Sequence, residues 1–527
     1  FATGQELVRA ILAMPVDLFW NGGIGTYVKA SSETHADVGD RGNDAVRIDA
    51  TELRARIVAE GGNLGLTQAA RVEAALAGVR LDSDAIHNSG GVDLSDHEVN
   101  YKILLAPLLR SGRLAPAARR EALFSVADDA CEDVLAHNRA QALSISLDER
   151  RSRDDPQAFL WAQEHLCQSQ GVDPRELRLP DAPALQARRA SGRGLLRPEL
   201  SVLLGLAKLH VQGALAGDPL LDRPAVAPLY EAYFPSALRA RFPDTLAAHP
   251  LRREIAALAL TNRLVDAGGL TALPTLVAGR GLPVGAAVAA LLGAEEVTDA
   301  PGWRARLVAA AAPREAVYAG LLCLESSVAD VARYLLASGL DVLQGDLALR
   351  LRAALDELRA HLREFLSAGE TAQWEERRRR FADAGLPQAL ADDVATFPLA
   401  DRGVNAVRVL AGVARPPVEV GRTYARLGEG TGINGVYQRL AAAEASDPWD
   451  RMVLADLRTQ LLDLQRELTA RVLAPGPADA KAAADAFLSD NAEAIARVEA
   501  LQQPALARAS ASALSVVTQA LLRLRER

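Results

Sequence analysis

Residues 56–67 read RIVAEGGNLGLT, a stretch in which a short apolar run, a glycine turn and a helix start follow one another directly. The apolar run at 56–59 predicts a buried strand, and residues 67–77 predict the helix that comes after it. The glycines allow the backbone to turn tightly between the two elements. This order of strand, turn and helix is the repeating unit of a parallel sheet covered by helices.

The same order occurs twice more in the first hundred residues. Residues 15–20 (PVDLFW) predict a strand that ends at the turn 21–25 (NGGIG). Residues 84–87 predict a short third strand that ends at the turn 88–91 (NSGG), with a helix over 95–109 after it. Ligands of parallel sheets bind beyond the carboxyl ends of the strands, where all three predicted turns fall.

After residue 110 the sequence is rich in strong helix formers. Leucines recur at steps of three and four between 351 and 362 and again between 454 and 468, which is the spacing of packed helices. The predicted fold class is therefore α/β followed by all-α, with a partial Rossmann-like parallel sheet and a large C-terminal helical bundle. The expected domains are 1–110 for the α/β part, 111–340 for the first helical part and 341–527 for the bundle.

Composition excludes several classes of protein. The 527 residues are 49% hydrophobic and 24% charged, the proportions of a folded globular chain. The net charge of −8 argues against nucleic acid as the main partner, because phosphate binding needs a basic face. No run of apolar residues is long enough to predict a membrane span. The three scattered cysteines favour a reducing cytoplasm over a disulfide framework.

The turn at 61–63 has a functional and a structural interpretation. Gly61 and Gly62 would let a ligand approach the backbone, and the Asn63 amide could hydrogen-bond a ribose or an amide. Alternatively, the glycines only form a tight turn and Thr67 only caps the next helix. The residues by themselves favour the structural interpretation.

The segment 88–98 (NSGGVDLSDHE) is the richest in polar groups. Ser95 and Glu98 fit a capping box at a helix start, and the alternative is that the Ser95 hydroxyl faces a substrate carboxylate there. The residues by themselves favour capping. Adjacent Asp96 and His97 point to different sides of a helix, so they are not expected to act as a pair. The eight histidines show no metal-binding spacing, and no metal is expected.

Two other features are expected to be structural. Lys29 follows the first glycine turn and is interpreted as a surface lysine. Residues 430–435 (GTGING) match the G-x-G-x-x-G pattern of dinucleotide sites, but a helical stretch precedes them instead of a strand. A loop between two helices is therefore expected at 430–435.

Taken together, the three glycine motifs resemble the large NAD-specific glutamate dehydrogenases of bacteria. They lie in the family's order over residues 15–105, as PVDLFWNGGIGTYVK, RIVAEGGNLGLTQAARVE and NSGGVDLSDHEVNYKILL. The helical remainder is similar more loosely, for example at 194–203 (GLLRPELSVL) and 233–242 (YFPSALRARF). The resemblance makes residues 1–110 the C-terminal half of an NAD-binding Rossmann-like domain.

The resemblance also implies roles for individual residues. It places Asn63 beside the nicotinamide of NAD, and it makes Ser95 the group that holds a substrate carboxylate. The implied cofactor contacts are Asn63, Gly61, Gly62, Asn21, Gly22 and Gly23, and the implied substrate contacts are Ser95, Asn88 and Gly91. The sequence departs from smaller glutamate dehydrogenases at Gly62, where they carry alanine, and at Asp96 and His97, where they carry aromatic residues.

The implied reaction is the reversible oxidative deamination of L-glutamate to 2-oxoglutarate and ammonia, with NAD accepting the hydride, in a cytoplasmic homo-oligomer. The family's catalytic lysine and aspartate and its phosphate-binding glycines are expected upstream of Phe1, so these 527 residues alone are expected to be inactive. The alternative interpretation is a non-catalytic helical scaffold with a vestigial α/β cap.

Overall fold

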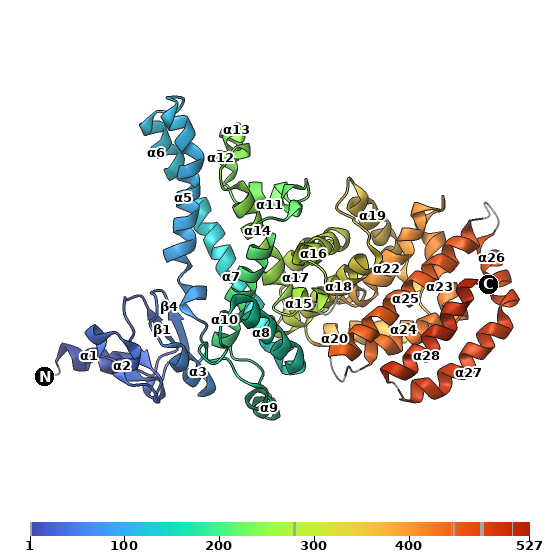
Figure 1. The fold of residues 1–527 in the computed structure, drawn as a ribbon, viewed down its shortest axis with the longest axis horizontal. Helices are drawn as coiled ribbons and strands as arrows, with labels where there is room; N and C mark the ends of the chain where they lie inside the picture. Colours follow the sequence, from blue (N-terminus) through green and yellow to red (C-terminus); the bar gives the residue numbers. More distant parts are fainter. Residues whose placement is uncertain are drawn as a thin grey trace. The chain divides into compact units, whose positions relative to one another are not determined.

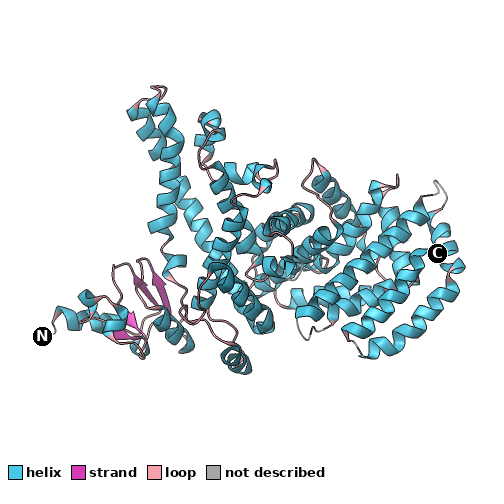
Figure 2. Ribbon diagram, viewed as in Figure 1, coloured by secondary structure: helices cyan, strands magenta, loops and turns pink. Residues whose placement is uncertain are grey.

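The computed structural model describes residues 3–277, 281–443, 445, 448–474, 479–508 and 510–526, so Phe1 lies outside the described residues. The chain forms two compact units, Phe1–Val288 and Ala289–Arg527. The strands belong to the first unit, and the elements that follow them are helical (Figure 2). The predicted fold class of α/β followed by all-α is therefore confirmed. The domain boundaries at 110 and 340 stay a prediction.

Two short parallel strand pairs form the α/β part. β1 (Leu18–Asn21) pairs with β4 (Ile57–Glu60) so that Asn21 lies opposite Glu60 at the carboxyl ends. β2 (Val28–Lys29) pairs with β3 (Ile48–Asp49). The strands predicted at 15–20 and 56–59 are confirmed with a slight shift along the chain. The second pair was not predicted, because a strand of two residues carries no periodic pattern.

The predicted third strand at 84–87 is wrong, because α4 (Asp84–His87) is a single helical turn. Arg80 takes the place beside β4, where it makes an isolated parallel bridge with Ile57. The Val58 amide donates to the Arg80 carbonyl at 3.0 Å. The residues DAIH hold two apolar side chains, too few for a period that separates a strand from a helical turn.

Helices follow this part of the chain in the first unit. The helix predicted after β4 is confirmed as α3 (Gln68–Leu76), and its N-cap Thr67 accepts a hydrogen bond from the Ala70 amide at 3.0 Å. α5 (Ser89–Arg110) begins beside the carboxyl end of β4 and packs along α7 (Ala127–Asp154) (Figure 1). α10 (Arg197–Leu215) and α14 (Arg252–Gly268) pack against α7 in turn.

The other helices of this part of the chain are shorter. They are α1 (Gly4–Leu12), α2 (His35–Val38), α6 (Pro116–Phe124), α8 (Pro156–Gln170), α9 (Ala182–Ala190), α11 (Ala227–Ala232), α12 (Ser236–Arg241), α13 (Pro243–Ala247), α15 (Ala272–Val277) and α16 (Val284–Thr298).

The second unit is built from helices whose leucine stripes form its core. In α25 (Pro448–Leu473) the five predicted leucines, Leu454, Leu457, Leu461, Leu464 and Leu468, are all buried. In α19 (Leu347–Ala360) the stripe is buried as far as Leu358, but the helix ends before Leu362. The expected loop at 430–435 is confirmed in part, since Thr431 and Gly432 join α23 (Pro417–Gly430) to α24 (Ile433–Ala442).

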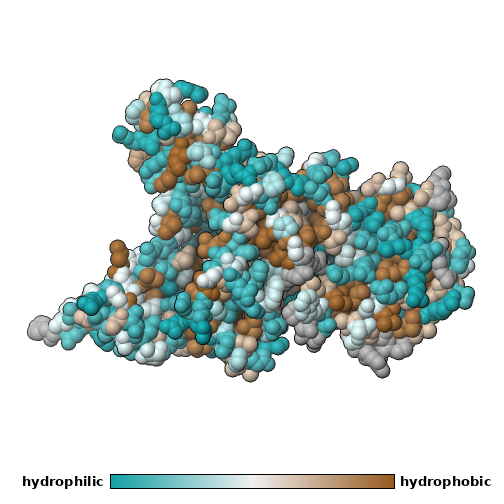
Figure 3. All heavy atoms as spheres, in the orientation of Figure 1, coloured by the Kyte–Doolittle hydropathy of each residue, from teal (hydrophilic) through white to brown (hydrophobic). Residues whose placement is uncertain are grey.

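The remaining helices of this unit complete the bundle. They are α17 (Ala300–Ala309), α18 (Arg314–Ser338), α20 (Ala368–Asp383), α21 (Gln388–Val394), α22 (Ala400–Val407), α26 (Ala480–Asp490), α27 (Ala492–Arg508) and α28 (Ala511–Leu522). On the face shown in Figure 3, hydrophobic residues lie in small groups among hydrophilic ones. Among the described residues, no helix combines the length and the apolar character needed to cross a membrane.

Candidate functional site

The turns that follow β1 and β4 touch each other through their backbones. The Gly61 amide donates to the Asn21 carbonyl at 2.8 Å. A Cβ atom placed on Gly62 would lie 2.2 Å from the carbonyl oxygen of Gly23, which is closer than any real side chain tolerates. Glycine is therefore required at position 62, because the atom that a Cβ would meet belongs to the backbone.

An exposed tryptophan covers both turns. A Cβ atom on Gly22 or on Gly61 would meet the Trp20 ring at 2.3 and 2.6 Å, so the indole lies across the two glycines. Trp20 is 65% exposed although it is large and apolar. Two residues of the turns themselves, Ile24 and Leu64, are also large, apolar and exposed. A group of exposed apolar side chains marks a surface that binds a ligand or another part of a protein.

A buried charge network fixes the loop 61–66. The Arg71 guanidinium donates to both carboxylate oxygens of Glu60, at 2.7 and 2.8 Å, and both side chains are buried. Burial alone would lower the pKa of Arg71, but the hydrogen bond and charge of Glu60 outweigh it and raise that pKa. Glu60 also accepts from the Leu66 amide, and Asp84 accepts from the Leu64 amide. Both ends of the loop are therefore held by buried or half-buried carboxylates.

The loop after β4 is tied to the start of α5 by two asparagines. The exposed Asn63 accepts a hydrogen bond at its Oδ1 atom from Nδ2 of Asn88, at 2.5 Å. Asn88 directly precedes α5, and its side chain lies over Gly91, where a Cβ atom would be 2.8 Å from Asn88 Oδ1. Three of the predicted site residues, Asn63, Asn88 and Gly91, are thus brought together.

The predicted capping box at Ser95 and Glu98 is wrong. α5 begins at Ser89, so Ser95 lies inside the helix, where its hydroxyl donates to the Val92 carbonyl at 2.7 Å. Glu98 instead forms an ion pair with Lys102 one turn later. The helix starts at Ser89, although its N-cap residue Asn88 makes no side-chain capping hydrogen bond. Ser95 is exposed and lies one helical turn beyond Gly91.

The first turn holds two further polar groups. Asn21 is buried, and its Oδ1 atom accepts from the Gly23 amide at 3.2 Å, while its Nδ2 atom has no hydrogen-bond partner. Lys29 was expected at the surface, but it lies in β2, is buried and forms an ion pair with Asp49. The expectation failed because the two-residue strand that carries Lys29 could not be recognised in the sequence.

Sequence reasoning missed a cluster on α5 and α7. Asp93, His97 and His137 offer ligand atoms that all lie within 4.8 Å of one another. The only local signal is the spacing of Asp93 and His97, which puts both on one face of a helix. His137 joins them from a helix 40 residues further along the chain, so no spacing rule could have found it.

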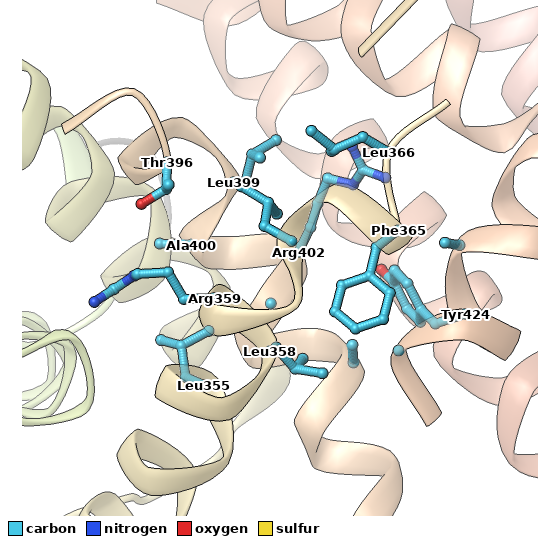
Figure 4. Close-up of a pocket in the computed structure, with 15 residues that line it drawn as sticks. Leu355, Leu358, Arg359, Phe365, Leu366, Thr396, Leu399, Ala400, Arg402 and Tyr424 are labelled. Atoms are coloured by element: carbon cyan, nitrogen blue, oxygen red, sulfur yellow. The ribbon is translucent and has the colours of Figure 1, made fainter. Parts of the chain in front are cut away.

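A largely apolar pocket with a volume of about 80 Å³ lies in the second unit. Its lining includes Leu355, Leu358, Phe365, Arg402 and Tyr424 from α19, α22, α23 and the turn after α19 (Figure 4). None of the residues that line it is a predicted site residue.

Known families cover both ends of the chain. A family model described as "Glutamate dehydrogenase, C-terminal" matches residues 192–524, and one described as "Bacterial NAD-glutamate dehydrogenase, catalytic domain" matches residues 1–148. The chain is 35% identical over 490 residues to the NAD-specific glutamate dehydrogenase of Halomonas elongata, covering 92% of this chain and 30% of that protein.

Two further relatives agree with this match. The chain is 32% identical over 503 residues to the NAD-specific glutamate dehydrogenase of Pseudomonas aeruginosa, covering 94% of this chain and 31% of that protein. It is 34% identical over 479 residues to the protein of the same name from Mycobacterium tuberculosis, covering 89% of this chain and 29% of that protein. The chain therefore spans less than a third of the length of these relatives.

Proposed function

Because this chain belongs to the bacterial NAD-specific glutamate dehydrogenase family, we propose that it supplies the nicotinamide side of an NAD site and one contact to the substrate carboxylate. The proposed reaction converts L-glutamate reversibly to 2-oxoglutarate and ammonia in a cytoplasmic homo-oligomer. The observation that carries the proposal is the hydrogen bond between Asn63 and Asn88, which joins the turn after β4 to the helix that bears Ser95.

The residues of the two turns suit a nicotinamide nucleotide. NAD, when bound, supplies the acceptor for the hydride. Asn63 uses its oxygen for Asn88, and within the described part of the chain no protein group bonds to its Nδ2 atom, so this donor is available to a ribose or carboxamide oxygen. Gly22 and Gly61 present bare backbone beneath the Trp20 indole, and an exposed aromatic plane suits a flat heterocycle.

Ser95 suits a carboxylate ligand. Its exposed hydroxyl now donates to carbonyls of its own helix, and rotation of the side chain would let it donate to a carboxylate instead. It lies in the second turn of α5. A hydrogen bond to a charged group of this kind contributes about 1.5–3 kcal/mol to binding.

The catalytic lysine and aspartate are proposed to come from outside these 527 residues. Lys29, the lysine closest in sequence to the first turn, is buried and its ammonium group is engaged in an ion pair with Asp49. The isolated chain is expected to bind nucleotide without turning over glutamate. Turnover by the isolated chain at the rate of the full-length protein would contradict this.

Steady-state kinetics of the full-length protein test the proposal. Ser95→Ala should raise KM for glutamate about tenfold to a hundredfold, from the free energy of the lost hydrogen bond. The matched control is Ser111→Ala, since the Ser111 hydroxyl also donates to a carbonyl of α5, but at the other end of the helix. Equal KM values for Ser95→Ala and Ser111→Ala would contradict the substrate role.

The cofactor contact needs a separate comparison. Asn63→Ala and Asn88→Ala both remove the hydrogen bond between the two asparagines, but only Asn63→Ala removes the proposed cofactor donor. Asn63→Ala should therefore weaken NADH binding more than Asn88→Ala does. If the wild-type protein binds neither NADH nor glutamate while it remains folded, the scaffold interpretation is the correct one.

A further inference from the structure

Three potential metal ligands meet where α5 packs on α7. Asp93 and His97 lie one helical turn apart on α5, and His137 faces them from α7. The His137 Nδ1 atom is 2.8 Å from Asp93 Oδ2, and the His97 Nε2 atom is 3.7 Å from Asp93 Oδ1. The ligand atoms of all three side chains lie within 4.8 Å of one another.

The His97 imidazole is fixed in place with one nitrogen unused. Its side chain is only 1% exposed, its ring stacks on Tyr233 at a centroid distance of 4.3 Å, and its Nδ1 atom is 3.0 Å from the Tyr101 hydroxyl. The other nitrogen, Nε2, is buried and has no hydrogen-bond partner. Buried polar atoms without a partner are rare in folded proteins, so this nitrogen calls for a ligand.

The three side chains are of types that bind transition metals, as neutral imidazole and carboxylate. In the structure His137 Nδ1 and Asp93 Oδ2 instead share a hydrogen bond.

We propose that Asp93, His97 and His137 bind a divalent transition-metal ion, with zinc the best fit, and leave a fourth position open. Zinc prefers four ligands at about 2.0–2.1 Å, which puts neighbouring ligand atoms about 3.3 Å apart. The separations of 2.8 and 3.7 Å lie on either side of this value but involve different oxygens of Asp93. One ligand atom from each residue lies within 4.8 Å of the others, so side-chain rotation has to draw the three together to complete the site. Two imidazoles and one carboxylate form a ligand set typical of zinc sites with an open position.

Other charged groups around the cluster influence binding. Lys208 of α10 interacts electrostatically with Asp93 and His137, but it is engaged in an ion pair with Asp266 of α14. Asp96 of α5 and Asp133 of α7 add negative charge, and the tyrosines Tyr101 and Tyr233 complete the surroundings.

Zinc titration of the chelator-treated 527-residue chain tests the site. Isothermal titration calorimetry should show one zinc ion per chain, and Co²⁺ in its place should give the intense visible absorption of a four-coordinate ion. His137→Gln and Asp93→Asn should each weaken zinc binding about a hundredfold or more. His137 is one-third exposed, and although its ring stacks on His97 at a centroid distance of 5.9 Å, the Tyr233 and Tyr101 contacts of His97 do not involve it.

The matched control is His210→Gln. His210 contacts the His165 ring at a centroid distance of 5.1 Å, which makes it a second histidine pair of the same unit, and the cluster at Asp93 does not include it. This variant should bind zinc like the wild type. Absence of zinc binding by the wild type, or equal binding by His137→Gln and His210→Gln, would overturn the proposal. The titration needs neither NAD nor glutamate, so its outcome is independent of the proposed dehydrogenase function.

Discussion

Replacing Gly62 with alanine tests whether the turns after β1 and β4 meet through their backbones. The added Cβ atom would lie 2.2 Å from the Gly23 carbonyl oxygen, and a backbone oxygen cannot swing aside as a side chain can. Overpacking of this kind costs about 1–3 kcal/mol. For a unit of this size, each kcal/mol corresponds to roughly 2 °C, so the first unit should unfold about 2–6 °C lower.

Differential scanning calorimetry measures this shift, and hydrogen exchange of residues 57–66 locates it. Gly90→Ala is the control, because Gly90 lies inside α5 and a Cβ atom there meets no atom within 4 Å. Alanine should stabilise that helix by about 0.5–1 kcal/mol. If Gly62→Ala unfolds at the wild-type temperature with unchanged exchange at 57–66, the backbone contact between the turns does not exist.

Two further predictions concern buried charges of the first unit. Arg71→Ala should lower the free energy of unfolding by about 3–5 kcal/mol in chemical denaturation, because it leaves Glu60 buried without its partner. Arg56→Ala should lower it by less than about 1 kcal/mol, because the ion pair of Arg56 with Asp17 is exposed. Equal losses of stability in the two variants would contradict the buried network. Burial favours the neutral form of Asp82, but the hydrogen bond of His87 and the charge of Arg197 outweigh burial and lower the pKa of Asp82 below its unfolded value. The ionised Asp82 therefore stabilises the folded state above about pH 4, and this contribution is lost as the pH falls through the folded pKa. Asp82→Asn should therefore lower stability most at pH 7. If the denaturation midpoints of the wild type and Asp82→Asn differ by the same amount at every pH between 3 and 7, Asp82 does not have this role.

The parts of the fold that could be predicted are those with a signal several residues long. The leucine stripe of α25 runs over several helical turns, and the apolar runs before Asn21 and Glu60 end in glycine turns. The strand predicted at 84–87 failed because two apolar residues do not establish a period. The apparent capping box at Ser95 and Glu98 failed because α5 already begins at Ser89.

The site was predictable only where its residues share a motif. Asn63, Asn88 and Gly91 lie in two glycine motifs, and the structure brings them together. The charged pairs near these residues were not predictable, because the two members of each pair are distant in sequence. Arg71 reaches back to Glu60 across the whole loop, and His137 pairs with Asp93 from 44 residues away. Such contacts depend on how helices and strands pack, and the spacing of residues within one segment does not predict that packing.

Hydrogen–deuterium exchange of the full-length protein, with and without NADH and 2-oxoglutarate, tests the central claim most directly. If the two turns and the start of α5 form one ligand site, amides at 61–66 and 89–95 should exchange more slowly when both ligands are present, while those of α19 at 347–360 should not change. Ligand binding that leaves 61–66 and 89–95 unchanged and protects another part of the chain would contradict the proposed site.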